Sequence, residues 1–239
     1  MYYLFFAISG LPLITMALII WLITVQFDKR LYLLHLLTQF WSTFLFSVVP
    51  GWKIKVIGKE KIDNSKALVF VSNHQSEFDI IVVSKLCAHF KWVSKAEVFK
   101  VPIVGWNMKL NKYIELKRGD RKSILQMMKD CGTALRNGSS VFIFPEGTRS
   151  STGLMRNMAS GAFTLAQREK VGIQPIVVNG TKDIMHKGDW KLNFKANLSL
   201  EVLDEIPYEE IKDLDTNDLS KMVKETIAAK VWEHQDQSA

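Results

Sequence analysis

The sequence predicts an α/β protein with a mixed, mostly parallel sheet flanked by helices, preceded by an N-terminal two-helix membrane-associated segment. Two observations carry this prediction. Short apolar runs of strand type alternate with segments of helical period along most of the chain, which is the pattern of α/β folds. The first 50 residues carry only three charged side chains, Asp28, Lys29 and Arg30. We therefore expect a membrane-anchoring helical segment at 1–50 and an α/β domain at 51–239.

The N-terminal segment holds two apolar runs. Residues 1–27 carry no charge, and residues 31–52 carry none apart from the titratable His35. As helices they would be roughly 40 Å and 33 Å long, enough to cross a hydrocarbon core of about 30 Å. A cleaved signal peptide fits poorly, because no basic residue precedes the first run and no small-residue cleavage site follows it. Two spans, one span and a helical hairpin in one leaflet remain open.

The predicted strands of the body differ in character. Segment 52–58 alternates apolar and polar residues, which is the strand period. Segment 67–72 is a continuous apolar run, typical of a strand buried on both faces. Further strands are predicted at 91–94, 112–117, 140–144, 174–180 and 196–203.

Between these strands the apolar residues recur with the helical period. Helices are predicted at 76–87, at 121–137, at 161–169 and from near Thr216 onward. Gly138 is expected to cap the second of them. Cys87 and Cys131 fall inside apolar helical patterns without metal-ligand spacing. We therefore expect both to be reduced core residues of a cytosolic domain.

The charge balance narrows the partners. The chain has 31 Lys and Arg against 24 Asp and Glu, a net charge of +7. A basic body suits nucleic acid, an anionic membrane surface or an acidic soluble substrate. Since no nucleic-acid-binding motif is present, no nucleic-acid partner is expected. The basic body and the link at Lys29 and Arg30 favour the cytoplasmic face of a membrane, the inner membrane if the protein is bacterial.

A polar cluster, "SNHQSEFD", follows the strand predicted at 67–72. Ser76 and Asp79 fit a capping box, in which the serine begins the helix and the acid bonds back to it. His74 would then lie before the helix, where its ring can reach Asp79. A carboxylate fixes the tautomer of a histidine and stabilises its imidazolium, so the pair is a candidate general base. No G-x-S-x-G serine is present, so the hydroxyl to be activated belongs to a substrate. A helix cap without catalysis remains the structural alternative.

A second polar cluster, "PEGTRSS", follows the strand predicted at 140–144. Arg149 suits a phosphate, and Gly147 lets the backbone approach one closely. The structural alternative is a turn with a local ion pair between Glu146 and Arg149. Hydroxyl and basic residues that extend the candidate anion site are Thr148, Ser150, Ser151, Thr152, Lys95, Lys117 and Arg118.

These two clusters resemble motifs of the glycerolipid acyltransferase family typified by 1-acyl-sn-glycerol-3-phosphate acyltransferases. The first block of that family, N-H-x-x-x-x-D, is present as Asn73, His74 and Asp79. The third block, F-P-E-G-T-R-S, is complete at residues 144–150. The resemblance covers about residues 52–205.

The second and fourth blocks lie in the expected order. Segment 93–120 is similar to the second block and includes Lys95 and Arg118, and the apolar strand around Pro175 is similar to the fourth. The family usually has a Phe-Lys-Lys-Gly-like segment after the third block. This chain has "MASG" at 158–161 instead, which keeps the glycine and lacks the lysines.

The resemblance implies an acyl transfer in phospholipid biosynthesis. His74, held by Asp79, would deprotonate the sn-2 hydroxyl of lysophosphatidic acid, which attacks an acyl thioester, either acyl-CoA or acyl-carrier protein, and yields phosphatidic acid. The thioester is a co-substrate, and no metal or other cofactor is implied. The implied partners are a lysophospholipid acceptor, the acyl donor and a phospholipid membrane. The implied acceptor contacts are Asn73, Lys95, Arg118, Glu146, Gly147, Thr148 and Arg149.

Two other functions stay open. The "MASG" segment motivates an acyltransferase with a different acceptor, such as another lysophospholipid, lysocardiolipin or an amino-acid lipid. A non-catalytic protein that binds anionic lipid is the other alternative, and it would need neither His74 nor Asp79.

Overall fold

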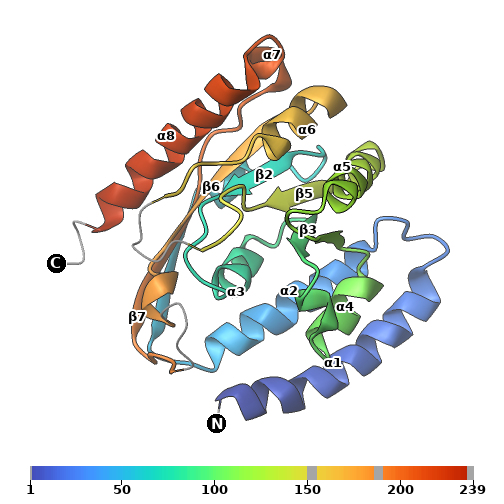
Figure 1. Ribbon diagram of the computed structural model, residues 1–239. Coiled ribbons are helices and arrows are strands. Elements are labelled where there is room, and N and C mark those ends of the chain that lie inside the picture. Colours follow the sequence, from blue (N-terminus) through green and yellow to red (C-terminus); the bar gives the residue numbers. More distant parts are fainter. Residues whose placement is uncertain (1, 150–154, 186–190, 236–239) are drawn as a thin grey trace.

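A computed structural model of the chain describes residues 2–149, 155–185 and 191–235. In this part of the chain, seven strands form one sheet in the order β1-β7-β6-β2-β5-β3-β4 (Figure 1). Neighbouring strands are parallel except β6 and β7. The mixed, mostly parallel sheet predicted from the sequence is therefore confirmed. The strands are β1 (Trp52–Ile57), β2 (Val69–Ser72), β3 (Phe90–Lys95), β4 (Ile114–Leu116), β5 (Ser140–Ile143), β6 (Ile173–Asn179) and β7 (Ala196–Val202).

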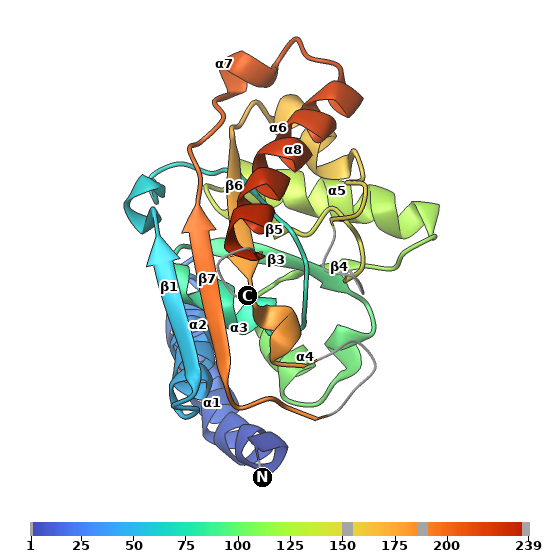
Figure 2. The same ribbon diagram turned by 90° about the vertical axis from the view of Figure 1, so that its left-hand side faces the viewer.

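Helices cover both faces of this sheet, as Figures 1 and 2 show. Helices α5, α6 and α8 lie over one face, and α2 and α3 lie over the other. The helices are α1 (Tyr2–Thr24), α2 (Tyr32–Ser47), α3 (Asp79–Val83), α4 (Val104–Leu110), α5 (Arg121–Arg136), α6 (Gly161–Glu169), α7 (Tyr208–Ile211) and α8 (Thr216–Gln235). Short 3₁₀ turns add η1 (Lys59–Lys61), η2 (Ser84–Leu86), η3 (Val98–Lys100) and η4 (Thr181–Asp183).

The strands supply side chains to two apolar cores, one on each face. Val69 and Val71 belong to the core under α5, α6 and α8. Phe70 belongs to the opposite core, with Phe90 and Phe142. Burial of each of these phenylalanines stabilises the fold by about 1.5–3 kcal/mol. Because alternate side chains of β2 are buried on both faces, its sequence is apolar without alternation.

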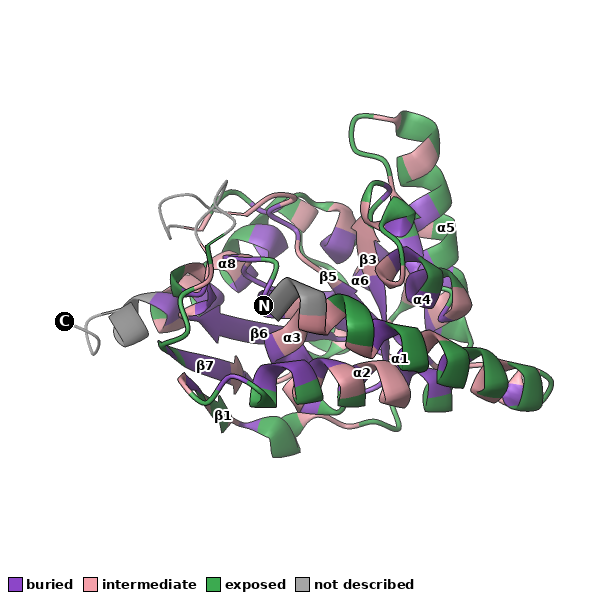
Figure 3. Cartoon of the chain, turned by 90° about the horizontal axis from the view of Figure 1, so that it is seen from below, coloured by how far each residue is buried: buried purple, intermediate pink, exposed green. Residues whose placement is uncertain are grey.

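Two helices precede the sheet, as the sequence predicts. Only α1 is long and apolar enough to cross a membrane among the described helices, with its candidate span at Phe5–Thr24. Figure 3 shows that much of its surface is exposed. It packs against α2 through Phe6 and Trp41, whose ring centroids lie 4.9 Å apart, and against the α4 region, where Gly10 meets Ile103.

Helix α2 is shorter and more buried than α1. Its Gln39 side chain donates to the carbonyl of Ala88 at 2.7 Å, and Phe46 lies in the same core as β1 residue Trp52. Helix α2 is thus packed against the α/β body. The division at residue 50 stays a prediction, and α2 is in contact with residues beyond that boundary.

Two expectations for residues 76–87 are wrong. The helix does not begin at Ser76: α3 starts at Asp79, and a 3₁₀ turn follows it. The Asp79 carboxylate accepts the N–H groups of Gln75 and Ser76, which holds the preceding residues in a turn instead of a helix. Cys87 is exposed, not part of the core, because it follows the 3₁₀ turn with a left-handed backbone, φ 53°. Cys131 is buried, as expected.

Candidate active site

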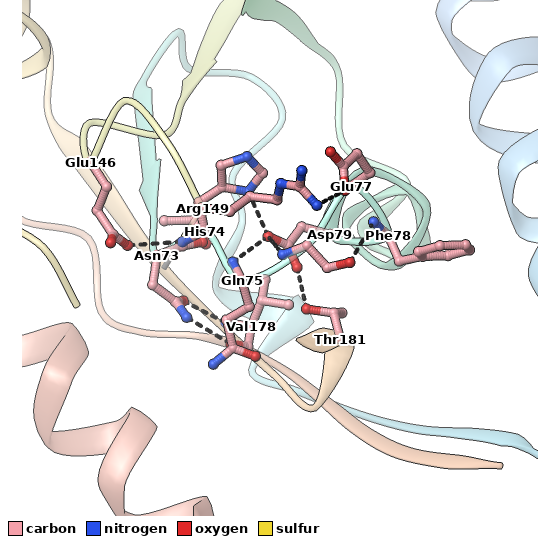
Figure 4. A network of polar contacts seen from close by, with 12 residues as sticks. Asn73, His74, Gln75, Glu77, Phe78, Asp79, Glu146, Arg149, Val178 and Thr181 are labelled. Atoms are coloured by element: carbon pink, nitrogen blue, oxygen red, sulfur yellow. Dashed lines mark hydrogen bonds and ion pairs between the residues drawn. The ribbon is translucent and has the colours of Figure 1, made fainter. Parts of the chain in front are cut away.

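His74 and Asp79 meet at the end of β2. His74 Nδ1 lies 2.7 Å from Asp79 Oδ2 (Figure 4). The carboxylate is fully buried and also accepts the N–H groups of Gln75 at 2.7 Å and Ser76 at 3.0 Å. Its other oxygen accepts the hydroxyl of Thr181. Four donors therefore fix the carboxylate, and the carboxylate in turn fixes the histidine tautomer with its proton on Nδ1.

The capping box predicted for this stretch is half present. Asp79 bonds back to the N–H of Ser76, as such a box requires. The Ser76 hydroxyl, however, accepts the N–H of Phe78 at 3.4 Å, while the N–H of Asp79 bonds to the Ser76 carbonyl. The cap and the His74–Asp79 pair thus share one carboxylate, and the pair forms as the sequence analysis expects.

The His74 ring lies between Asp79 and an aromatic ring. It stacks on Phe144, with 4.3 Å between centroids and 21° between the planes. The side chain is 14% exposed and lines a cavity of about 430 Å³. With Nδ1 bonded to Asp79, the nitrogen that can take a proton from a molecule in this cavity is Nε2.

Asn73 and Glu146 hold the His74 loop from behind. The Asn73 side chain makes two bonds to the backbone of Val178 in β6, both 2.8 Å. Glu146 accepts the backbone N–H groups of His74 at 2.9 Å and Arg156 at 2.8 Å. Burial raises the pKa of this carboxyl. Neither side chain lies in the cavity wall among the described residues, so their predicted substrate contacts stay predictions, and their observed contacts are structural.

Three basic residues from three different strand ends line the same cavity. Lys95 ends β3, Arg118 follows β4, and Arg149 follows β5. Burial lowers the pKa of Lys95, and the charges of Arg118 and Arg149 lower it further. Burial also lowers the pKa of Arg118. Three cationic side chains that line one cavity form a site that favours an anion.

The FPEGTRS segment brings only some of its residues to this wall. Gly147 and Arg149 line the cavity, and Thr148 does not. Gly147 has φ 70°, a conformation that favours glycine. The alternative of a local Glu146–Arg149 ion pair is wrong, because Glu146 binds backbone N–H groups and Arg149 pairs with Glu77. Ser150, Ser151 and Thr152 lie outside the described residues.

The rest of the cavity wall is mostly apolar. It comes from α2, α3, α4, α5 and α6 and from strands β3, β4 and β5 with the residues that follow them. Six of its apolar members are Trp92, Val104, Met108, Leu116, Met127 and Phe144. Cavities of this size and character bind small molecules. Among the described residues, no group of three or more His, Cys, Asp and Glu side chains is placed to hold a metal ion.

Sequence reasoning missed three side chains here. Thr181 donates to the Asp79 carboxylate from η4, Glu77 pairs with Arg149, and Phe144 supports the His74 ring. Thr181 had a signal, since it follows the Asn179-Gly180 end of β6 just as the two motifs follow strand ends.

The sequence of this fold and site matches one protein family. Residues 53–179 match the family model described as "Acyltransferase", which is more than half of the chain, and the chain belongs to this family. It is 40% identical over 155 residues to "1-acyl-sn-glycerol-3-phosphate acyltransferase LPAT1, chloroplastic" from Arabidopsis thaliana, covering 64% of this chain and 43% of that protein. It is 35% identical over 145 residues to "1-acyl-sn-glycerol-3-phosphate acyltransferase" from Pseudomonas aeruginosa, covering 59% of this chain and 56% of that protein.

A solved structure supports the fold. The crystal structure titled as the 1-acyl-sn-glycerophosphate (LPA) acyltransferase PlsC from Thermotoga maritima has a TM-score of 0.73 to this chain at 22% identity. The match covers 96% of this chain and 97% of the chain in that crystal structure. It confirms the predicted α/β fold. The chain spans about half the length of the curated relatives that it matches.

Proposed function

We propose that this protein transfers a fatty acyl group from an acyl thioester to the sn-2 hydroxyl of lysophosphatidic acid, forming phosphatidic acid. One observation carries the proposal: the carboxylate-bound His74 lines the same cavity as Lys95, Arg118 and Arg149. A general base and an anion site in one cavity suit an acceptor that has both a hydroxyl and a phosphate. The names of the relatives from Arabidopsis thaliana and Pseudomonas aeruginosa agree with this acceptor.

The chemistry assigned to the pair is general base catalysis. His74 Nε2 takes the proton of the acceptor hydroxyl as its oxygen attacks the thioester carbonyl. Asp79 stabilises the imidazolium that forms. The tetrahedral intermediate then expels the thiolate, which takes the proton back from His74, so the base is restored after each turnover. The donor, acyl-CoA or acyl-carrier protein, is a co-substrate, and these steps involve no cofactor.

The other predicted site residues fall into two groups. Lys95, Arg118, Gly147 and Arg149 are proposed to bind the acceptor phosphate from the cavity wall. Asn73 and Glu146 are proposed to position His74 through their backbone contacts. The predicted Thr148 contact has no place in the described wall.

The apolar wall and helix α1 fit a lipid substrate. Side chains such as Trp92 and Met108 offer an apolar surface to an acyl chain. We propose that α1 attaches the protein to a phospholipid membrane. The charges of Lys29 and Arg30 at its end favour a body on the cytoplasmic face, the inner membrane in a bacterium.

A panel of acceptors tests this function. Purified full-length protein is given one labelled acyl thioester, as acyl-CoA or acyl-carrier protein, with lysophosphatidate or other lysolipids. We expect labelled phosphatidic acid as the main product and none with His74→Ala. The second candidate is a different lysolipid acceptor, because Ala159 and Gly161 of the "MASG" segment line the cavity without lysines. Preferential transfer to another lysolipid would establish that candidate, and binding without thioester consumption would overturn both.

A further inference from the structure

An acidic residue, Glu77, lines the same cavity as the cation cluster of Lys95, Arg118 and Arg149. The Glu77 carboxylate pairs with the guanidinium of Arg149, and both side chains line the cavity with His74 (Figure 4). The two residues are 72 positions apart in the chain, so the pair joins the loop after β2 to the loop after β5. The proposed mechanism gives Glu77 no role, and it stands where an acceptor phosphate would need Arg149.

The charges around this ion pair favour a ligand with two negative charges. Glu77 and Glu97 both act on the charge of Lys95, as do Arg118 and Arg149. Of these groups, Lys95, Arg118, Arg149 and Glu77 line the cavity, and Glu97 does not. Displacement of the Glu77 carboxylate would raise the positive charge of the cavity wall by one. A phosphate monoester carries about −1.5 to −2 at pH 7, so the wall without Glu77 attracts it more strongly than the wall with Glu77.

The Glu77 carboxylate can move from its ion pair into solvent, whereas the carboxylate of its neighbour Asp79 cannot. The Glu77 side chain is 53% exposed, whereas Asp79 is fully buried. An exposed carboxylate can exchange its ion pair for water at small cost. Arg149, at 20% exposed, is the more enclosed partner and would remain in the wall to meet the incoming anion.

We propose that Glu77 is an internal substitute for the acceptor phosphate: it holds Arg149 in the empty site and is displaced when a phosphate monoester binds. This inference rests on the proposed function, in which Arg149 binds the acceptor phosphate. An acceptor phosphate that binds Nη1 of Arg149 must replace the Glu77 carboxylate there. Glu77 therefore weakens acceptor binding, sets the KM and favours acceptors with two negative charges over phosphodiesters with one.

Direct anion binding tests this role without acyl transfer. Inorganic phosphate and sn-glycerol 3-phosphate are titrated into full-length wild-type protein and Glu77→Gln, followed by phosphorus NMR. The matched control is Glu225→Gln, an exposed glutamate on α8. We expect the Kd of Glu77→Gln to fall about two- to fivefold, the range for an exposed ion pair, and that of the control to stay unchanged. Arg149→Ala should bind phosphate weakly. Adding Glu77→Gln to this variant should improve phosphate binding little, because the Arg149 partner of Glu77 is already removed.

Kinetics with lysophosphatidate separate this inference from the proposed function. Glu77→Gln should lower the KM by a similar factor and leave kcat close to wild type, since the pair is broken before the acyl group moves. Active protein whose Kd and KM are the same in wild type and Glu77→Gln would overturn the role of Glu77 alone. Protein that transfers no acyl group to any lysophospholipid, yet binds phosphate more tightly in Glu77→Gln, would overturn the proposed function and support the Glu77–phosphate competition.

Discussion

His74 and the pair His35 and His89 occupy opposite kinds of environment in one fold. His74 has a carboxylate behind its ring and a cavity in front of it. His35 is fully buried between the Tyr113 hydroxyl, 2.7 Å from Nδ1, and the Ala88 carbonyl, 3.1 Å from Nε2. His89 is 4% exposed, and its Nε2 lies 3.0 Å from the Ser139 hydroxyl.

The two rings differ in whether an anionic group is bonded to them. The His74 ring is bonded to the carboxylate of Asp79, whereas the charges of Lys91 and Arg30 oppose a proton on His89. Burial, together with these cations, lowers the pKa of His89 to about 3. A histidine becomes a candidate base where an anion supports its cation and a cavity reaches its free nitrogen. Where both are lacking, the same side chain serves packing and hydrogen bonding.

Replacement of His74 and of His89 should give the largest difference in effect between the two environments. His74→Ala should lower kcat with lysophosphatidate by about 10²–10⁴-fold, the contribution of a general base. His89→Gln should keep the wild-type turnover of the folded protein, because His89 lies outside the cavity wall. The measurement is a steady-state rate below the melting temperature of each variant. Equal losses in both variants, or wild-type turnover in His74→Ala, would contradict the assigned roles.

Asp79→Asn separates the charge behind His74 from its geometry. One amide oxygen can replace Oδ2 and accept from His74, Gln75 and Ser76, while the amide N–H group donates to the Thr181 hydroxyl. The fold should therefore survive, but the imidazolium loses its counter-charge, and we expect kcat to fall by about 10²-fold. Thermal unfolding checks the fold and kinetics the rate. A variant that melts near wild type and turns over normally would show that the charge is dispensable.

The sequence predicts the elements and contacts that depend on residues close together in the chain. The apolar run at 67–72 and the residues of α6 are local patterns, and both elements form where expected. The His74–Asp79 contact follows from a five-residue spacing at a strand end. One further partner of the pair comes from a distant part of the sequence: Thr181 is 102 residues from Asp79. No local period encodes that contact.

The buried histidines illustrate the same limit. His35 lies in an apolar run that predicts a membrane helix, yet its ring is bonded to Tyr113, 78 residues away. The sequence shows an apolar segment but not the surface that it covers, because tertiary packing decides which polar groups are satisfied inside the protein. For the same reason, the spacing of Glu146 predicts a polar residue at a strand end and not its two backbone partners.

Ser139→Ala should affect stability and not activity. Ser139 is 2% exposed, and its hydroxyl is bonded to His89 Nε2. The other ring nitrogen of His89 has no hydrogen-bond partner in the described part of the chain, so the variant leaves the whole ring unsatisfied. An unsatisfied buried polar group costs about 1–3 kcal/mol. Urea unfolding should show this loss while kcat stays at the wild-type value, and unchanged stability would contradict a structural role for the bond.

The smallest expected effect is the pH dependence of stability that His89 contributes. Its pKa falls from 6.5 to about 3 on folding, so between these values the unfolded chain binds a proton that the folded protein does not. Stability is therefore full above pH 6.5 and declines as the pH falls toward 3.

From pH 6 to pH 5 this one group should remove about 1 kcal/mol from the free energy of unfolding. The measurement is the difference between wild type and His89→Gln, since the remaining titratable groups are common to both proteins. His35, Lys91 and Arg30 face His89 in each protein, so their effects largely cancel. The stability difference between the two proteins should shift in favour of His89→Gln as the solution is acidified. A difference independent of pH would show that His89 keeps an ordinary pKa despite its burial, and the electrostatic contrast with His74 would then fail.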